Sequence, residues 1–302
     1  QGMASARAAI STDKRMGKLM VGRSNKRKKG IRMIVENSGV QKSVCLCRFY
    51  EMGRIFRNLF GIYALIVFTL SVLVVLPGYF LVFLLASKER APRLAHRLIS
   101  RSWASVLFLL FGIRVKVRNS QVLDPEKTYV FAANHRSLLD IPSYAIACQN
   151  TFRFLSKEEL TKIPGMGWII RKLYITVDRK DKAARLRSMD RMVQSLRDGV
   201  SVFLCPEGTR NKTNRPLLDF HDGAFRVAIE AQVPLAVMTI IHSDTLLSPL
   251  HPIALMPGRI ECIWEHPIET SGMTVQDVPR LRETVKILML KHLEEVARLR
   301  QK

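Results

Sequence analysis

The residues best suited to chemistry are His135 and Asp140, in the stretch 129–140 (YVFAANHRSLLD). Residues 129–133 form a short apolar run that predicts a buried strand, and a helical pattern begins at Leu138. His135 therefore lies where a strand gives way to a helix. The spacing lets the Asp140 carboxylate reach one imidazole nitrogen and leaves the other free to take a proton. The alternative is that Asp140 or Ser137 caps the helix and His135 is a loop residue.

The rest of the chain predicts the elements that would position this pair. Apolar, β-branched runs predict an edge strand at 114–118 and further strands at 152–156, 174–177, 200–204, 235–241 and 259–264. Helical patterns cover 182–198, 223–231 and 274–300, and the last begins with a Thr-x-x-Asp capping pattern. The apolar face of helix 182–198 contains Leu186, Met189, Val193 and Leu196, and that of helix 274–300 contains Leu281, Val285, Leu288, Val296 and Leu299. The alternation predicts an α/β fold, with a mostly parallel sheet and helices on both faces.

Several charged side chains follow other predicted strands directly. Lys157 follows the strand at 152–156, and Asp178 and Arg179 follow the strand at 174–177. In a parallel sheet these groups gather at the same edge as His135, where α/β proteins bind ligands. Each also has a simpler explanation, because Lys157 could begin a solvated helix and Arg179 could pair with Asp178. Together the cations indicate an anionic substrate.

The strand at 200–204 is followed by Cys205 and then by the sequence PEGTR. This sequence predicts a rigid turn that offers a glycine backbone, a hydroxyl and a guanidinium able to grip a phosphate through two hydrogen bonds. By itself it could be only a β-turn with a surface salt bridge. Its residues are Pro206, Glu207, Gly208, Thr209 and Arg210.

The composition points to an anionic partner. The chain has 302 residues, 48% of them hydrophobic, and a formal net charge of +23. Nucleic acid, an anionic lipid surface and a phosphorylated substrate are the candidate partners. Residues 1–51 are basic and lack an apolar period, so we expect a disordered arm or a non-native leader there. Nucleic acid is disfavoured, because aromatic residues are almost absent from this arm and no nucleic-acid motif follows.

Residues 59–86 contain no charged side chain and exceed the roughly 20 residues that cross a hydrocarbon core. Pro77 and Gly78 interrupt the run, so it could be one kinked spanning helix or a hairpin that enters one leaflet and returns. Basic residues flank both ends, which favours a membrane-embedded helical hairpin on the cytoplasmic side. The run at 103–113 predicts a second apolar helix, against the same leaflet or under the soluble domain. We divide the chain into an arm at 1–51, a membrane-anchoring region at 52–113 and an α/β domain at 114–302.

Other kinds of site find little support. The five cysteines form no metal-type Cys-x2-Cys pair, and His242, His251 and His266 lack the spacing of metal ligands, so no metal site is expected. A Gly-x-Ser-x-Gly elbow, a phosphate-binding P-loop and a dinucleotide fingerprint are all missing from the sequence. Ser137 could suggest an acyl-serine mechanism, but no elbow presents it.

The motifs NHRSLLD, SKEEL with IPGMGW, VDR, PEGTR and VPLAVM follow one another in this order after the apolar segment. In this the chain resembles the glycerophospholipid acyltransferase family, and most closely its bacterial 1-acylglycerol-3-phosphate acyltransferases. By that resemblance His135 and Asp140 form a catalytic dyad. The positions that the family uses to bind the acceptor or hold the site together correspond to Lys157, Arg179, Glu207, Gly208, Thr209 and Arg210.

The resemblance implies transfer of a fatty acyl group from acyl-CoA or acyl carrier protein to lysophosphatidic acid, at the cytoplasmic face of a membrane such as the bacterial inner membrane. Anionic membrane lipids would be partners, and no cofactor is required. Cys205 replaces a usual aromatic residue and YITVDR replaces the commoner IFIDR, which bears on acceptor or chain-length preference. The alternatives are an acyltransferase for glycerol 3-phosphate, another lysophospholipid or a lyso-aminolipid, and a non-catalytic protein that binds membrane surfaces.

Overall fold

The computed structural model describes residues 27–87, 90–178 and 180–301. The chain divides into two units, Gln1–Met52 and Gly53–Lys302, and the sheet with its covering helices belongs to the second. We expected no regular structure in residues 1–51. Residues 1–26 of this segment lie outside the described part. Helix α1 (Arg27–Leu85) begins within that segment.

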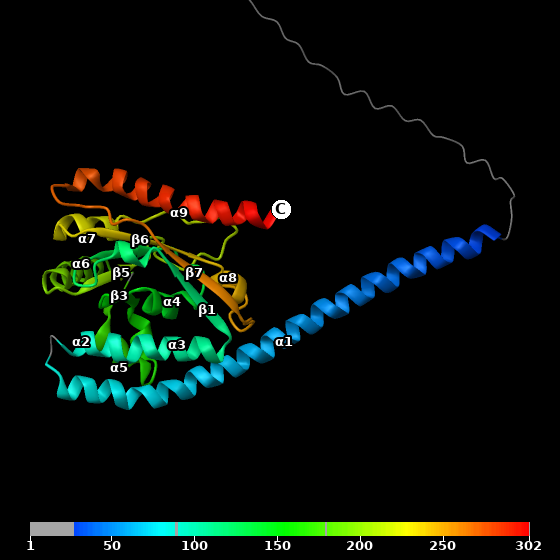
Figure 1. Cartoon of the computed structure of the whole chain (residues 1–302), viewed down its shortest axis with the longest axis horizontal. Helices are drawn as coiled ribbons and strands as arrows, with labels where there is room; N and C mark the ends of the chain where they lie inside the picture. The colour runs from blue at the N-terminus through cyan, green and yellow to red at the C-terminus, as the bar shows by residue number, and fades with distance from the viewer. Residues whose placement is uncertain (1–26, 88–89, 179, 302) are drawn as a thin grey trace, which may run out of the picture. The chain divides into compact units, whose positions relative to one another are not determined.

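A seven-stranded sheet forms the centre of the second unit (Figure 1). Its spatial order is β1-β7-β6-β2-β5-β3-β4, and all neighbours are parallel except β6 and β7. The predicted strands are confirmed to within one residue at each end, and β1 lies at an edge. Strands β2 to β6 thus direct their carboxyl ends to one edge, whereas β1 and β7 point the other way. The strands are β1 Ile113–Arg118, β2 Val130–Ala133, β3 Phe152–Lys157, β4 Ile175–Val177, β5 Ser201–Leu204, β6 Leu235–Ile241 and β7 Gly258–Trp264.

Helices cover both faces of the sheet, as predicted (Figure 1). Strand β2 shows why, because Phe131 and Ala133 belong to one core cluster and Val130 and Ala132 to the other. The first cluster includes residues of α3 and α4, and the second includes residues of α6, α7 and α9. The helices after α1 are α2 Ala91–Leu94, α3 Arg101–Leu110, α4 Asp140–Ala147, α5 Met166–Leu173, α6 Lys182–Arg197, α7 Gly223–Ala231, α8 Ser243–Leu246 and α9 Val278–Gln301. Short π or 3-10 turns are η1 Ala95–Ser100, η2 Ser120–Val122, η3 Glu158–Lys162 and η4 Val275–Asp277.

The buried faces of two helices differ in part from the predicted faces. In α6, Leu186 is exposed and Met192 lies in the core instead. Both residues flank the shared stripe of Met189, Val193 and Leu196, and packing on the sheet selects the side of Met192. In α9, Leu299 is exposed and Met289 is buried, whereas the capping box of Thr274 and Asp277 is present as predicted.

Apart from its last residue, the apolar run at 59–86 lies in one helix, without a turn at Pro77 and Gly78. Helix α1 continues through Pro77 to Leu85, and the chain reverses before α2. Pro77 removes one backbone hydrogen bond from α1. Contacts with the segment that follows α2 nevertheless hold the helix on both sides of Pro77. Trp103 Nε1 donates to Ser71 Oγ at 2.9 Å, and the hydroxyls of Tyr79 and Ser100 are bonded at 2.8 Å. Of the two predicted shapes, one helix through Pro77 is therefore present. The chain turns back only after this helix, so α1 and the segment 91–110 form the two arms of a helical hairpin.

The first arm of this hairpin presents a large apolar surface. Residues Ile55–Leu85 are long and apolar enough to cross a membrane by length and composition, and only 11% of their most apolar window is buried within the protein. Helix α3 is different, because Ala104, Leu107 and Phe108 are buried. It forms part of the floor of the α/β domain, which was one of the two predicted placements.

Candidate active site

His135 and Asp140 are in contact, as their spacing predicted. Strand β2 ends at Ala133, and α4 begins at Asp140. His135 Nδ1 lies 2.8 Å from Asp140 Oδ2, and the Asp140 side chain is fully buried. A carboxylate accepts this bond from a protonated Nδ1, so Nε2 carries the lone pair. The His135 side chain is 17% exposed, and Nε2 has no hydrogen-bond partner among the described residues.

Asp140 also orders the turn that leads into its helix. The same Oδ2 accepts the backbone N–H groups of Arg136 at 2.7 Å and Ser137 at 2.8 Å. The negative charge lies in the first turn of α4, where the helix dipole favours it. The two interpretations of Asp140 are thus compatible, because one carboxylate both orders the helix start and orients the imidazole.

Asn134 and Tyr144 fix the direction in which the chain leaves β2. The Asn134 amide donates to Ile240 O at 3.0 Å and accepts from Ile240 N at 2.8 Å, so it pairs with β6 as a backbone group would. The Tyr144 hydroxyl donates to the Asn134 carbonyl. Both side chains are fully buried, so the backbone directly before His135 is held in place.

The loop after β5 holds the His135 backbone from both sides. The His135 N–H donates to Glu207 Oε1 at 2.9 Å, and the His135 carbonyl accepts from the Asn211 N–H at 2.7 Å. The second oxygen of Glu207 accepts the Leu218 N–H at 2.8 Å. Burial raises the pKa of the Glu207 carboxyl above its usual value, although these two N–H bonds oppose the shift. Both Glu207 oxygens are therefore engaged by the protein's own backbone.

The predicted turn at Pro206 is present, and its glycine is required. Gly208 N donates to Cys205 O at 2.9 Å, and Gly208 has a φ of 66°. That conformation is strained for other residues. A Cβ built on Gly208 would lie 2.6 Å from Cδ2 of His221, whose own N–H donates to Pro206 O at 2.8 Å. The ring of His221 thus occupies the space that a side chain at position 208 would need.

The predicted cations have different surroundings. Lys157 is half exposed and pairs with Glu159 at 2.9 Å, so it is partly neutralised. Arg179 lies outside the described residues. Thr209 is exposed, and Arg210 is half-buried with no carboxylate within ion-pair distance in the described part of the chain. Arg210 directly precedes Asn211, which contacts His135 through its backbone.

Sequence reasoning missed four residues that support the site: Asn134, Arg136, Tyr144 and Asn211. Arg136 pairs with Asp244 at 2.8 Å and donates to the carbonyl oxygen of Arg215 at 2.8 Å, so it ties the loop after β5 to α8. Arg136 lies within the first motif and Asn211 directly follows the second, and these positions were the only signal available for them.

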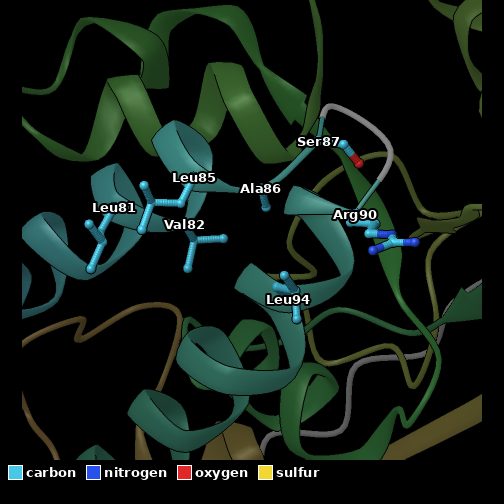
Figure 2. A pocket seen from close by; sticks show the side chains of 7 residues that line it. All are labelled: Leu81, Val82, Leu85, Ala86, Ser87, Arg90 and Leu94. Carbon is cyan, nitrogen blue, oxygen red and sulfur yellow. The ribbon is translucent and has the colours of Figure 1, made fainter.

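Two other features do not belong to the candidate site. The Ser137 hydroxyl is fully buried and donates to Leu247 O at 2.8 Å, so it is not presented to a substrate. A groove of about 620 Å³ lies at the turn of the helical hairpin (Figure 2). It is lined by Leu81, Val82, Leu85, Ala86, Ser87, Arg90 and Leu94, and therefore by neither His135 nor Asp140. Among the described residues, no three His, Cys, Asp or Glu side chains gather in a way that could hold a metal ion.

A histidine oriented by a buried carboxylate at the carboxyl edge of an α/β sheet can act as a general base on a hydroxyl. In a comparison with known protein families, residues 114–241 match the family described as Acyltransferase. The chain therefore carries an Acyltransferase-family domain, which confirms the family expected from the motifs.

Similar proteins with known names are also acyltransferases. The 1-acyl-sn-glycerol-3-phosphate acyltransferase alpha of Mus musculus is 32% identical over 192 residues, which are 62% of this chain and 66% of that protein. The chloroplastic 1-acyl-sn-glycerol-3-phosphate acyltransferase LPAT1 of Arabidopsis thaliana is 30% identical over 182 residues, 60% of this chain and 50% of that protein. The chain thus matches just under two thirds of the first relative and half of the second.

A solved structure shares the fold. The crystal structure of the 1-acyl-sn-glycerophosphate acyltransferase PlsC from Thermotoga maritima matches 80% of this chain and 97% of its own, with a TM-score of 0.68 and 24% identity. This likeness supports the mostly parallel α/β architecture that the sequence predicted.

Proposed function

We propose that this chain is a membrane-bound acyltransferase that moves a fatty acyl group from an acyl thioester to the free hydroxyl of 1-acylglycerol 3-phosphate, giving phosphatidic acid. One observation supports the proposal most strongly. His135 Nδ1 is hydrogen-bonded to the buried Asp140 carboxylate at 2.8 Å, and His135 Nε2 has no hydrogen-bond partner among the described residues. The names of the relatives point to the same acceptor.

In the proposed reaction, His135 Nε2 takes the proton of the acceptor hydroxyl as the oxygen attacks the thioester carbonyl. A C–O ester bond forms and the C–S bond breaks, and the departing thiolate then takes the proton from the imidazolium. Asp140 stabilises the imidazolium between these steps. General-base assistance of this kind contributes about 10²- to 10⁴-fold. A thioester is already activated, so no cofactor is needed.

The remaining side chains have proposed roles that follow from their contacts. Glu207 and Gly208 hold the His135 loop, because the oxygens of Glu207 are engaged by backbone groups and Gly208 permits the turn. Arg210 binds the acceptor phosphate, since it lacks an internal counter-ion in the described structure and adjoins the contact with His135. Lys157, Arg179 and Thr209 complete the acceptor site by family resemblance.

The apolar arm of α1 would keep the enzyme where its lipid substrate resides. We therefore retain residues 52–113 as the membrane anchor and residues 114–302 as the catalytic domain, on the cytoplasmic face. Acyl-CoA and acyl carrier protein are the candidate donors. The similar proteins come from an animal, a plant and a bacterium. The proposal therefore does not specify a bacterial membrane.

The test is thiol release from an acyl-CoA in detergent, with and without lysophosphatidic acid, for wild type and His135→Ala. We expect acceptor-dependent release that falls at least about 10²-fold in the variant, with phosphatidic acid identified by mass spectrometry. His266→Ala is the matched control, because this exposed histidine lies outside the candidate site.

An unchanged rate in a folded His135→Ala variant would remove His135 as the base. Release that proceeds only with glycerol 3-phosphate or another lysolipid would change the acceptor. No release with any of these acceptors would favour the non-catalytic membrane-binding protein.

A further inference from the structure

The loop between β6 and β7 is unusually apolar. It follows the carboxyl end of β6, at the same edge of the sheet as His135. Residues 245–258 (TLLSPLHPIALMPG) contain no Asp, Glu, Lys or Arg. Leu250 is 62% exposed and Ile253 is 51% exposed, and Met256 is also exposed. Solvent loops are usually rich in polar residues, so this composition needs an explanation.

The exposed side chains do not result from a poorly folded loop. Leu246, Leu247, Ala254 and Leu255 are buried, so the loop already contributes to the core. Its backbone groups are paired in local turns, since His251 N donates to Ser248 O at 3.2 Å and Ala254 N donates to His251 O at 3.0 Å. Met256 N donates back to Leu246 O at 2.9 Å. The loop therefore presents Leu250 and Ile253 on a backbone that needs few hydrogen bonds from water.

The loop rests directly on the apolar arm of α1. A side chain at Gly61 would overlap the carbonyl oxygen of Ile253, so the helix and the loop meet backbone to backbone. Around Gly61 the helix exposes Leu59, Ile62 and Leu65. The exposed residues of the loop thus continue an apolar surface that is long enough to lie in a membrane.

The same loop is tied to the candidate active site. Leu247 O accepts the Ser137 hydroxyl at 2.8 Å, and Asp244, just before the loop, pairs with Arg136 at 2.8 Å. Ser137 and Arg136 both belong to the turn that joins His135 to Asp140. The position of the loop tip relative to the dyad is therefore set by direct contacts.

We propose that residues 248–257 form a second membrane contact, in which Leu250 and Ile253 enter the leaflet that holds α1. The contact sets the depth of the dyad at the bilayer surface. The occupant is a lipid bilayer because the loop is contiguous with the apolar arm of α1 and carries no acidic side chain, and Arg259 is exposed beside it to meet anionic headgroups. This inference rests on the proposed function only in placing the enzyme on a membrane.

The test measures the position of the loop directly. The full-length Ile253→Cys variant, with Cys45, Cys47 and Cys205 changed to serine, is labelled with an environment-sensitive fluorophore. It is then bound to vesicles of phosphatidylcholine and phosphatidylglycerol. Cys148 and Cys262 are buried and stay in place. Glu283→Cys in the same background is the control, because Glu283 is exposed on α9. We expect spin-labelled lipid to quench the probe at 253 and aqueous iodide to quench the probe at 283.

A matched pair of double variants gives a second measurement. Leu250→Asp with Ile253→Asp should lower the vesicle-bound fraction about tenfold or more, because two apolar side chains leave the bilayer. Val275→Asp with Leu299→Asp replaces two equally exposed apolar residues elsewhere and should leave it unchanged.

Iodide quenching at 253 equal to that at 283 would overturn the inference, and so would equal binding by both double variants. Turnover is measured on the wild-type chain bound to the same vesicles. A water-exposed loop with full turnover contradicts only this inference, whereas an embedded loop without turnover contradicts only the proposed function.

Discussion

The backbone amide of His135 donates a hydrogen bond of 2.9 Å to the carboxylate of Glu207, which lies 72 residues later in the chain. The two residues follow β2 and β5, which are neighbouring parallel strands. The contact explains why NHRSLLD and PEGTR occur together. One turn carries the dyad, and the other holds the backbone of that turn through a buried acceptor.

Glu207→Gln should therefore damage the site without removing any side chain of the dyad. An amide offers one acceptor oxygen, so the N–H of His135 or Leu218 loses its partner. An unsatisfied buried donor costs about 1–3 kcal/mol in the free energy of unfolding. We expect a lower kcat with little change in the KM for lysophosphatidic acid, measured beside the denaturation midpoint. Glu283→Gln, on the exposed face of α9, should match wild type. A rise in KM alone would place Glu207 against the acceptor instead.

The fold could be predicted from the sequence because its signals are local. Each strand is an apolar run of a few residues, and Gly199 and the Thr274 capping box mark helix ends within a few residues of the pattern. The choice between one helix and a hairpin at Pro77 could not be made from the sequence, because a proline weakens a helix only locally. Packing of the distant Ser100 and Trp103 decides whether the helix continues.

The site was predictable only in part, because only some of its contacts join residues that are close in the sequence. The contact between His135 and Asp140 spans five residues and follows from spacing. The bonds from Asn134 to Ile240 and from Arg136 to Asp244 span more than 100 residues. They depend on the register of β2 against β6, which the packing of the whole sheet sets and no local pattern reveals.

Arg210 provides a test of acceptor binding. A guanidinium that pairs with a phosphate contributes about 1.5–3 kcal/mol, so Arg210→Ala should raise the KM for lysophosphatidic acid about 10- to 150-fold. Arg210→Lys should recover only part of this loss, because an ammonium cannot make the paired contact. The control is Arg187→Ala, whose exposed side chain pairs with Asp181 at 3.4 Å. An equal effect of both alanine variants would mean that overall charge, not Arg210, attracts the substrate.

His96 predicts how stability depends on pH. It is buried against Phe152, with ring centroids 4.6 Å apart, and burial lowers its pKa to about 4. Below an unfolded value of about 6.5, the unfolded chain binds a proton that the folded protein does not. The free energy of unfolding should therefore decrease as the pH falls from about 6.5 towards 4, by roughly 3 kcal/mol in total.

Urea unfolding at a series of pH values, with His96→Leu beside wild type, checks this. The variant should lose the part of the pH dependence that His96 causes, and His266→Leu should keep it. An identical decrease in all three proteins would show that His96 is not responsible.

Two glycines of α1 should respond to alanine with opposite signs. A Cβ at Gly53 would meet nothing within 4 Å, so Gly53→Ala should stabilise the helix by up to about 1 kcal/mol through propensity alone. A Cβ at Gly61 would overlap the carbonyl of Ile253, which is backbone and cannot rotate away. Gly61→Ala should therefore lower Tm despite the better helix propensity, since overpacking costs typically about 1–3 kcal/mol. The comparison separates packing from propensity because both sites lie in one helix. If both variants raised Tm, the loop after β6 would not rest on α1.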